Sequence, residues 1–290
     1  MVKHLPPAVK QLLTLRNPNS FAGPPAGRLY GVLNKTFTDA KQRQAETGWL
    51  VLSTCTLLTS NIPSSMGHLY KFTTRTDPAD AASRTSVASA VQKAALIREA
   101  AVKSSIFVGV PRTILSLAGL MEALEDDVKG QLRNTTHPDR AASAENIDNV
   151  TTRGKELWKS IYEPHAVKLH DKLGSYHPDF ISFIIQAYGA VLAPLPGGES
   201  EQGNLSRALG SVVGTACLRA EGRVGPQLIS HVFGLLKARN AQGLNDEDRW
   251  LSSDEGTEWV IRTVDSILDV VQPAAEEGGK AGEGVLSAKL

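Results

Sequence analysis

One pattern of residues occurs twice in this chain, and it constrains the fold more than any other feature. The first copy reads GWLVLSTC at 48–55 and MGHLY at 66–70, and the second reads GSVVGTAC at 210–217 and LISHVF at 228–233. Each copy has the composition of an apolar helix, a short loop and a second helix that carries a histidine. Because such a unit cannot bury its apolar face alone, we expect the two copies to pack together within one domain.

Helical periodicity and turn signals extend along the rest of the chain, and no segment shows the apolar-polar alternation of a sheet. The sequence therefore predicts an all-α fold built from two similar halves. The expected helices lie at about 39–59, 77–106, 111–124, 149–173 with a break near Pro164, from 178 onward, 205–220, 226–239 and 252–271. The expected organisation is an irregular segment at 1–38, a first half at 39–129, a polar loop at 130–146, a second half at 147–272 and a flexible tail at 273–290.

Composition excludes several classes of protein. A net charge of +1 gives no electrostatic reason to expect nucleic acid or an anionic membrane as a partner. The most apolar stretch, 180–196, is interrupted by Gln186 and Gly189 and is shorter than the roughly 20 residues that a membrane helix needs. Two cysteines are too few for a disulfide-stapled scaffold. We expect no metal and no cofactor, because no ligand spacing or phosphate-binding loop is present; the spacings within His165, His170 and His177 do not suit a metal on one helix face.

The last three residues resemble an import address. Ala288, Lys289 and Leu290 form a close variant of the Ser-Lys-Leu signal that the peroxisomal import receptor reads, and the polar tail before them would expose the terminal carboxylate. The sequence therefore predicts a protein of the peroxisomal matrix. The alternative is a mitochondrial address, because residues 1–38 contain no acidic residue and five Lys or Arg. Proline pairs at 6–7 and 24–25 would interrupt the amphipathic helix of such a signal.

Two stretches resemble a known superfamily. The segment 205–240, with QLISH at 227–231 beginning a helix, is similar to the signature of the carboxymuconolactone decarboxylase and alkylhydroperoxidase D-like (AhpD-like) superfamily. EAAVK at 99–103 followed by VGVPR at 108–112 resembles the helix pair that follows this signature. More narrowly, the chain resembles a fungal peroxisomal branch of the superfamily. The resemblance implies an AhpD-like helical domain that assembles into a homo-oligomer, usually a trimer or hexamer, with its active pocket near subunit contacts.

The chain also departs from this superfamily. Peroxidase-type members carry a C-x-x-C motif with a histidine four residues after its second cysteine, and Val224 and Gln227 stand at the two cysteine positions before His231. Decarboxylase-type members often carry an acidic residue four positions before the histidine, where this chain again has Gln227. A dithiol cycle needs an attacking thiolate beside a resolving thiol, which Cys217 alone cannot supply. The general acid must therefore be His231 itself or a residue from elsewhere.

Five residues are candidates for a catalytic or binding site. His231 and Gln227, one turn apart, are candidates for an acid or base and the amide that orients it, with a buried structural histidine as the alternative. Cys217 is a candidate nucleophile, or else a small apolar residue of the core. Arg112, after a glycine-proline turn, could bind a carboxylate or remain solvated. Tyr188 could line a pocket.

Three further residues receive structural interpretations. His68 and Cys55 are the counterparts of His231 and Cys217 in the first copy, and we expect them to be structural. Glu99 has the spacing to Lys103 of an ordinary ion pair on a helix surface.

Together these patterns predict a peroxisomal protein similar to carboxymuconolactone decarboxylases. The leading hypothesis is a cofactor-independent enzyme that acts on a small carboxylated or acyl metabolite, with His231 facing a cavity as proton donor or acceptor. The alternatives are a non-catalytic helical protein that binds a metabolite or a protein partner in the peroxisome, and an antioxidant peroxidase that uses one cysteine.

Overall fold

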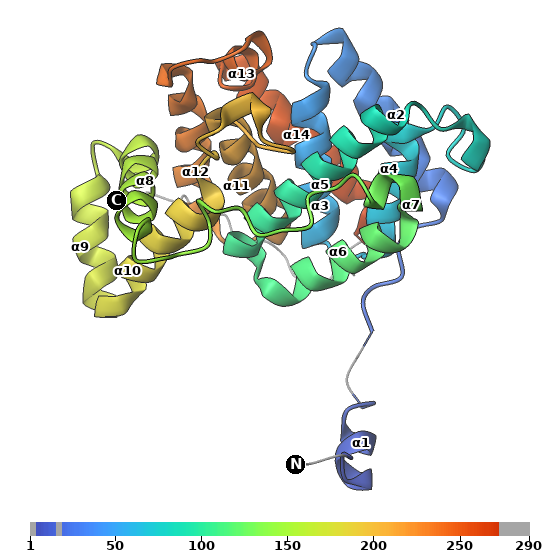
Figure 1. The fold of residues 1–290 in the computed structure, drawn as a ribbon, viewed down its shortest axis with the longest axis horizontal. Coiled ribbons are helices and arrows are strands. Elements are labelled where there is room, and N and C mark those ends of the chain that lie inside the picture. The colour runs from blue at the N-terminus through green and yellow to red at the C-terminus, as the bar shows by residue number, and fades with distance from the viewer. Residues whose placement is uncertain (1–3, 16–18, 273–290) are drawn as a thin grey trace, which may run out of the picture.

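The computed structural model describes residues 4–15 and 19–272, and it confirms the all-α prediction (Figure 1). Within these residues no strand is present. The helices are α1 (Pro7–Leu12), α2 (Ala26–Gln42), α3 (Glu46–Thr59), α4 (Ser64–Thr74), α5 (Val87–Val108), α6 (Val110–Ala123), α7 (Asp126–Lys129), α8 (Ile147–Tyr162), α9 (Ala166–Tyr176), α10 (Pro178–Ala187), α11 (Arg207–Glu221), α12 (Gly225–Lys237), α13 (Asp246–Leu251) and α14 (Asp254–Val271). Four short helical turns join them: η1 (Ala81–Ser83), the π-helical η2 (Tyr188–Leu192), η3 (Gly198–Ser200) and η4 (Ala238–Asn240).

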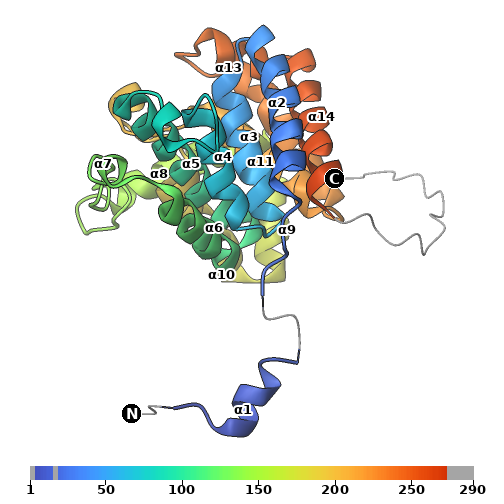
Figure 2. The same cartoon turned by 90° about the vertical axis from the view of Figure 1, so that its right-hand side faces the viewer.

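Helices α3 and α11 lie against each other at the centre of the molecule (Figures 1 and 2). Both are buried on nearly every side, which is the environment expected for helices that are apolar all round. The buried threonines of α3 bond within their own helix: the Thr54 and Thr56 hydroxyls donate to the carbonyls of Leu50 and Leu52 at 2.8 and 2.7 Å. These two helices are the apolar members of the repeated pattern, so the two copies do meet in the core.

The main core contains residues that precede the loop at 130–146 and residues that follow it. Helices α2 to α7 supply one part of it, and α11 to α14 supply the other. A second, smaller cluster is formed by α8, α9, α10 and η2, whose buried residues run from Leu157 to Ala193. The expected second half, 147–272, is therefore divided between two apolar clusters. This smaller cluster forms one end of the molecule in Figure 1.

Buried charges join the small cluster to the main core. Lys103, on α5, donates hydrogen bonds to the carbonyls of Val191, Leu192 and Ala193 at 2.8, 2.8 and 2.9 Å. Its ammonium also lies 3.3 Å from Glu99, which pairs in turn with Arg140. The prediction of a surface ion pair between Glu99 and Lys103 was wrong, because Lys103 is fully buried. Local spacing could not reveal carbonyl partners some ninety positions later.

Several helix boundaries differ from the expected ones. Helix α2 begins at Ala26, inside the segment predicted to be irregular, and a turn at Gln44, with φ of 55°, separates it from α3. Asp77 does not cap a long helix, since α5 begins at Val87 with the Ser86 hydroxyl as its cap. Helix α13 was not expected. By contrast, the break at Pro164 and the cap of α14 near Ser253 agree with the prediction.

No helix within the described ranges is both long and apolar enough to cross a membrane.

The small cluster depends on contact between two backbones. Gly154 on α8 and Gly189 on η2 lie face to face: a Cβ built on Gly154 would overlap the carbonyl of Ile185, and one built on Gly189 would overlap the carbonyl of Val150. Only glycine permits this approach, since backbone on both sides leaves no flexible side chain that could move away. The contact places Tyr188 beside α8.

Replacing Gly189 with alanine should therefore lower the free energy of unfolding by about 3 kcal/mol, because the new methyl group collides with a carbonyl oxygen. The matched control is Gly31→Ala on the exposed side of α2, where nothing lies within 4 Å of the new Cβ. This control should gain about 0.5–1 kcal/mol from helix propensity. Urea denaturation of the two variants measures both effects, and equal stability of Gly189→Ala and the unmodified chain would contradict the close packing.

Candidate functional site

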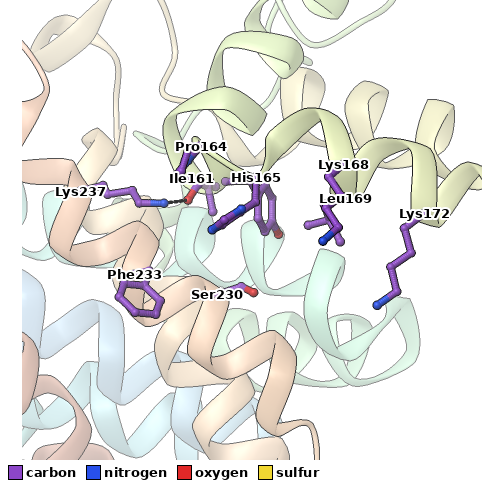
Figure 3. A pocket seen from close by; sticks show the side chains of 10 residues that line it. Ile161, Pro164, His165, Lys168, Leu169, Lys172, Ser230, Phe233 and Lys237 are labelled. Atoms are coloured by element: carbon purple, nitrogen blue, oxygen red, sulfur yellow. Dashed lines mark hydrogen bonds between the residues drawn. The ribbon is translucent and has the colours of Figure 1, made fainter. Parts of the chain in front are cut away.

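A pocket of about 350 Å³ opens between the α8–α9 corner and helix α12 (Figure 3). Its volume lies at the lower end of the range for small-molecule sites. Its walls are mainly apolar, and its nitrogen-bearing side chains come from three lysines and one histidine. The lining residues are Ile161, Tyr162, Pro164, His165, Lys168, Leu169, Lys172, Ser230, Phe233 and Lys237.

The α8–α9 corner gives the pocket its shape. Pro164 cannot continue α8, so the chain turns there and α9 starts at Ala166. Lys237 reaches across from the end of α12, and its ammonium donates hydrogen bonds to the carbonyls of Ile161 and Glu163 at 2.8 and 2.6 Å. These carbonyls belong to the end of α8, where backbone acceptors lack helical partners. The lysine thus fastens the corner to α12 and fixes the width of the pocket.

Tyr162 connects the pocket to His231 in the interior. The Tyr162 hydroxyl lies 3.2 Å from Nε2 of His231 and 3.0 Å from the hydroxyl of Tyr188. The edge of Phe107 and the backbone at Gly214 enclose the imidazole, and an added Cβ on Gly214 would lie 2.7 Å from Nδ1. His231 is only 4% exposed and does not line the pocket, so Tyr162 is its one link to that space among the hydrogen bonds of the described residues.

Tyr162, Tyr188 and His231 are all uncharged near neutral pH. Burial, and secondarily the positive charge of Arg207, lower the pKa of His231 from 6.5 to about 4. Burial also raises the pKa of Tyr162, although its hydrogen bond with Tyr188 opposes this. The pKa of Tyr188 is raised well above its usual value by burial and by the neighbouring Tyr162. The trio can exchange hydrogen bonds at neutral pH without any member carrying a charge.

Arg207 is a largely buried cation beside this trio. Its guanidinium donates to the hydroxyl of Ser160 at 2.9 Å, to the hydroxyl of Ser211 and to the carbonyl of Gly234 at 3.2 Å. Within the described part of the chain, no carboxylate lies at ion-pair distance from it. Burial lowers its pKa to about 10. Arg207 therefore supplies positive potential behind Tyr188 and His231 without a compensating negative charge.

The sequence-based candidates do not gather at one place. His231 and Tyr188 meet through Tyr162, whereas Gln227 is exposed one turn away and forms none of the hydrogen bonds described around the ring. Arg112 lies elsewhere, where its guanidinium pairs with Glu221 at 2.5 Å and donates to the carbonyl of Thr59 at 3.0 Å. We expected His231 to face a cavity. Its ring is instead buried and is connected to the pocket only through the hydroxyl of Tyr162.

The two cysteines lie together in the core instead. Cys55 and Cys217 are both fully buried, and the Ser104 hydroxyl lies 3.4 Å from the first sulfur and 3.3 Å from the second. His68, the counterpart of His231, has a tyrosine partner of its own: Nδ1 of His68 lies 2.8 Å from the hydroxyl of Tyr30.

Sequence reasoning missed Tyr162, Arg207 and the lysines on the pocket wall. Tyr162 stands two residues before the break at Pro164, and that position at a corner was the only available signal. The lysines at 168 and 172 follow one helical spacing on α9, which by itself indicates nothing more than a solvated face.

Residues 288–290 lie outside the described residues. Within the described ranges, no group of three or more His, Cys, Asp or Glu side chains could hold a metal ion. Comparison with known proteins finds no matching family model, no matching curated protein and no matching solved structure.

The buried, neutral state of His231 predicts a pH-dependent stability. The unfolded chain binds a proton at this ring below about pH 6.5, whereas the folded chain does so only near pH 4. The free energy of unfolding is therefore unaffected by this ring above pH 6.5. As the pH falls it decreases, by up to about 3 kcal/mol at pH 4, because the unfolded chain takes up the proton first. Urea denaturation across this range should show the loss in the unmodified chain and in the control His170→Gln, an exposed position. In His231→Gln this part of the pH dependence should disappear; an unchanged profile would contradict the buried neutral ring.

Proposed function

We propose that this protein binds a small carboxylated or acyl metabolite in the pocket between α9 and α12, and that Tyr162, supported by His231, is the proton donor of a cofactor-independent reaction. The observation that carries the proposal is the position of the Tyr162 side chain. It lines the pocket, and its hydroxyl is also hydrogen bonded to His231 and Tyr188. The proposal keeps the acid/base enzyme expected from the resemblance to the carboxymuconolactone decarboxylase-like and AhpD-like superfamily, but it moves the contact with substrate from His231 to Tyr162.

The lining of the pocket supports an anionic ligand with an apolar body. Ile161, Leu169 and Phe233 provide apolar walls, and burying apolar surface against them would supply most of the binding free energy. Lys168, Lys172 and Lys237 provide positive charge, while none of the described residues that line the pocket is acidic. A carboxylate, or the polar end of an acyl compound, is the chemistry that fits this combination.

The hydrogen bonds around Tyr162 support a role in proton transfer. If Tyr162 gives its proton to a substrate carbanion or enolate, a phenolate remains in a buried site. Tyr188 can donate a hydrogen bond to that phenolate, and so can His231 in the tautomer that carries its proton on Nε2. The charge of Arg207, which reaches Tyr188 and His231, favours the same anion. Bulk solvent would then restore the proton through the open pocket.

The second candidate function is binding without catalysis. The low pKa of His231 favours it, because an efficient general base titrates near the working pH and this ring stays neutral far below it. The same pocket would then hold a metabolite, with the Tyr162 hydroxyl serving only as a hydrogen-bond donor.

The peroxisomal matrix and a homo-oligomer remain part of the proposal. The terminal tripeptide at 288–290 supports import by the peroxisomal receptor, and the resemblance supports self-assembly. Masking the terminal carboxylate with a fusion partner tests the address, and a mitochondrial location would favour the basic amino-terminal segment instead.

Binding can be followed through a tryptophan beside the pocket. The ring centroid of Trp158 lies 4.1 Å from that of Tyr162, so a ligand in the pocket should change its fluorescence. A medium-chain fatty carboxylate should bind more tightly than the alcohol of the same chain. The variant Lys172→Met should weaken binding of the carboxylate about two- to five-fold, as expected for an exposed charge pair, and leave binding of the alcohol unchanged. The control Lys155→Met removes the same charge from an exposed position outside the pocket.

Equal affinity of the carboxylate and the alcohol would contradict the charge argument. Loss of the fluorescence change in Trp158→Phe, with heat of binding retained in calorimetry, would confirm which of the four tryptophans reports the ligand.

Turnover separates the two candidate functions. Tyr162→Phe keeps the ring that lines the pocket but removes the hydroxyl shared with His231 and Tyr188. An enzyme should keep its affinity for the ligand within a few-fold and lose turnover by about 10²–10⁴-fold, the usual contribution of a positioned proton donor. Comparing the metabolites of cells that contain the unmodified protein or this variant identifies the substrate as the compound that accumulates. Identical metabolite profiles would indicate that the protein binds its ligand without catalysing a reaction.

A further inference from the structure

We propose that Cys55 and Cys217 form a redox-active pair that a small hydroperoxide converts into an intramolecular disulfide between α3 and α11. This modification site is independent of the pocket at Tyr162. The chain has only these two cysteines, one in each copy of the repeated pattern, and the fold brings both to the contact of the two central helices.

The surroundings of the two sulfurs are shared. One hydroxyl lies between them: that of Ser104 on α5 donates to the Cys55 sulfur at 3.4 Å and accepts from the Cys217 thiol at 3.3 Å. The Thr59 hydroxyl, one turn beyond Cys55 on α3, donates to the Cys55 carbonyl at 2.7 Å and is near enough to Cys217 to lower the pKa of that thiol. Three groups with a movable proton therefore surround Cys217, and an inert apolar cysteine needs none of them.

This arrangement gives the two thiols different pKa values. Burial by itself would raise the pKa of Cys217, but its interactions with Cys55, Ser104 and Thr59 bring it below its usual value. Burial and the hydrogen bond with Cys217 raise the pKa of Cys55 well above its usual value. We assign the attack to Cys217, because Ser104 and Thr59 both lie beside it and Thr59 also lines the cavity described next, and we assign the resolving step to Cys55.

A second cavity gives access to the pair. A pocket of about 350 Å³ lies at the ends of α3 and α11 and is lined by Thr59, Arg112 and Glu221, among others. Thr59 is the link between this space and Cys217, since it lines the cavity and also lies near the sulfur. We expect hydrogen peroxide to reach Cys217 when the Thr59 side chain rotates away from the Cys55 carbonyl, and a bulky reagent to be excluded because both cysteines are fully buried.

The chemistry balances with a hydroperoxide as the oxidant. The Cys217 thiolate attacks the terminal oxygen of the peroxide, the O–O bond breaks, and the other oxygen leaves as an alcohol, or as water from hydrogen peroxide, after taking up a proton. Cys217 is now a sulfenic acid. The Cys55 sulfur then attacks the Cys217 sulfur, and the hydroxyl leaves with the Cys55 proton as water. The two thiols lose two electrons, and the peroxide gains them.

The test exposes the folded, reduced full-length chain to hydrogen peroxide and then counts its thiols after denaturation. The expected product is a monomeric chain that is lighter by two hydrogen atoms, with a Cys55–Cys217 cross-linked peptide that dithiothreitol cleaves. The folded protein should at the same time resist a bulky maleimide. In Ser104→Ala and Thr59→Val, which retain both cysteines, the cross-link should form at least several-fold more slowly.

Single variants test the assigned roles. Cys55→Ser should gain one oxygen atom at Cys217, whereas Cys217→Ser should keep Cys55 as a free thiol under the same treatment. Equal oxidation of the two variants would overturn the unequal roles. The proposal itself fails if the unmodified chain keeps both thiols, or if peroxide joins two chains through either cysteine. The decisive measurement is made on the unmodified chain, so the test can be interpreted even if a variant does not fold.

Discussion

The packing of α3 against α11 is the constraint on which the rest of the structure depends. Both helices are apolar on all sides, so neither can lie at the surface, and the other helices of the main core surround them. Helix α5 packs against both, and from it Lys103 and Phe107 extend toward the smaller cluster at one end of the molecule. The candidate site lies where this cluster packs against the rest of the molecule, between the α8–α9 corner and α12.

The chemistry of the site follows from how deeply each group is buried. A histidine sealed behind a phenol is a weak base, because burial favours its neutral form. The same burial protects the hydrogen bonds among Tyr162, Tyr188 and His231 from competing water, and an anion formed on Tyr162 would meet two donors and the field of Arg207. The site is therefore better suited to stabilising the phenolate that forms when Tyr162 donates its proton than to removing a proton from a substrate with His231.

Local patterns predicted the helices well where caps and periodicity agree, as at α11, α12 and α14, and the apolar helices of the two repeated segments, α3 and α11, do pack together. They failed where a distant contact decides the outcome. The i, i+4 spacing of Glu99 and Lys103 indicated an exposed pair, but the lysine is buried and donates to three carbonyls at the end of η2 and just after it. Spacing also could not show that Cys55 and Cys217 share Ser104 as a neighbour, or that Gln227 is exposed while Tyr162 bonds with His231. Those facts depend on how helices far apart in the sequence cross.

The most direct test of the account is a crystal structure of the protein with a medium-chain fatty carboxylate. The account predicts the hydrocarbon chain between α9 and α12, against Leu169 and Phe233, with an oxygen of the ligand at hydrogen-bond distance from the hydroxyl of Tyr162. A ligand bound elsewhere, or an empty pocket at saturating concentrations of a carboxylate that binds in solution, would contradict the claim that Tyr162 is where this protein meets its ligand.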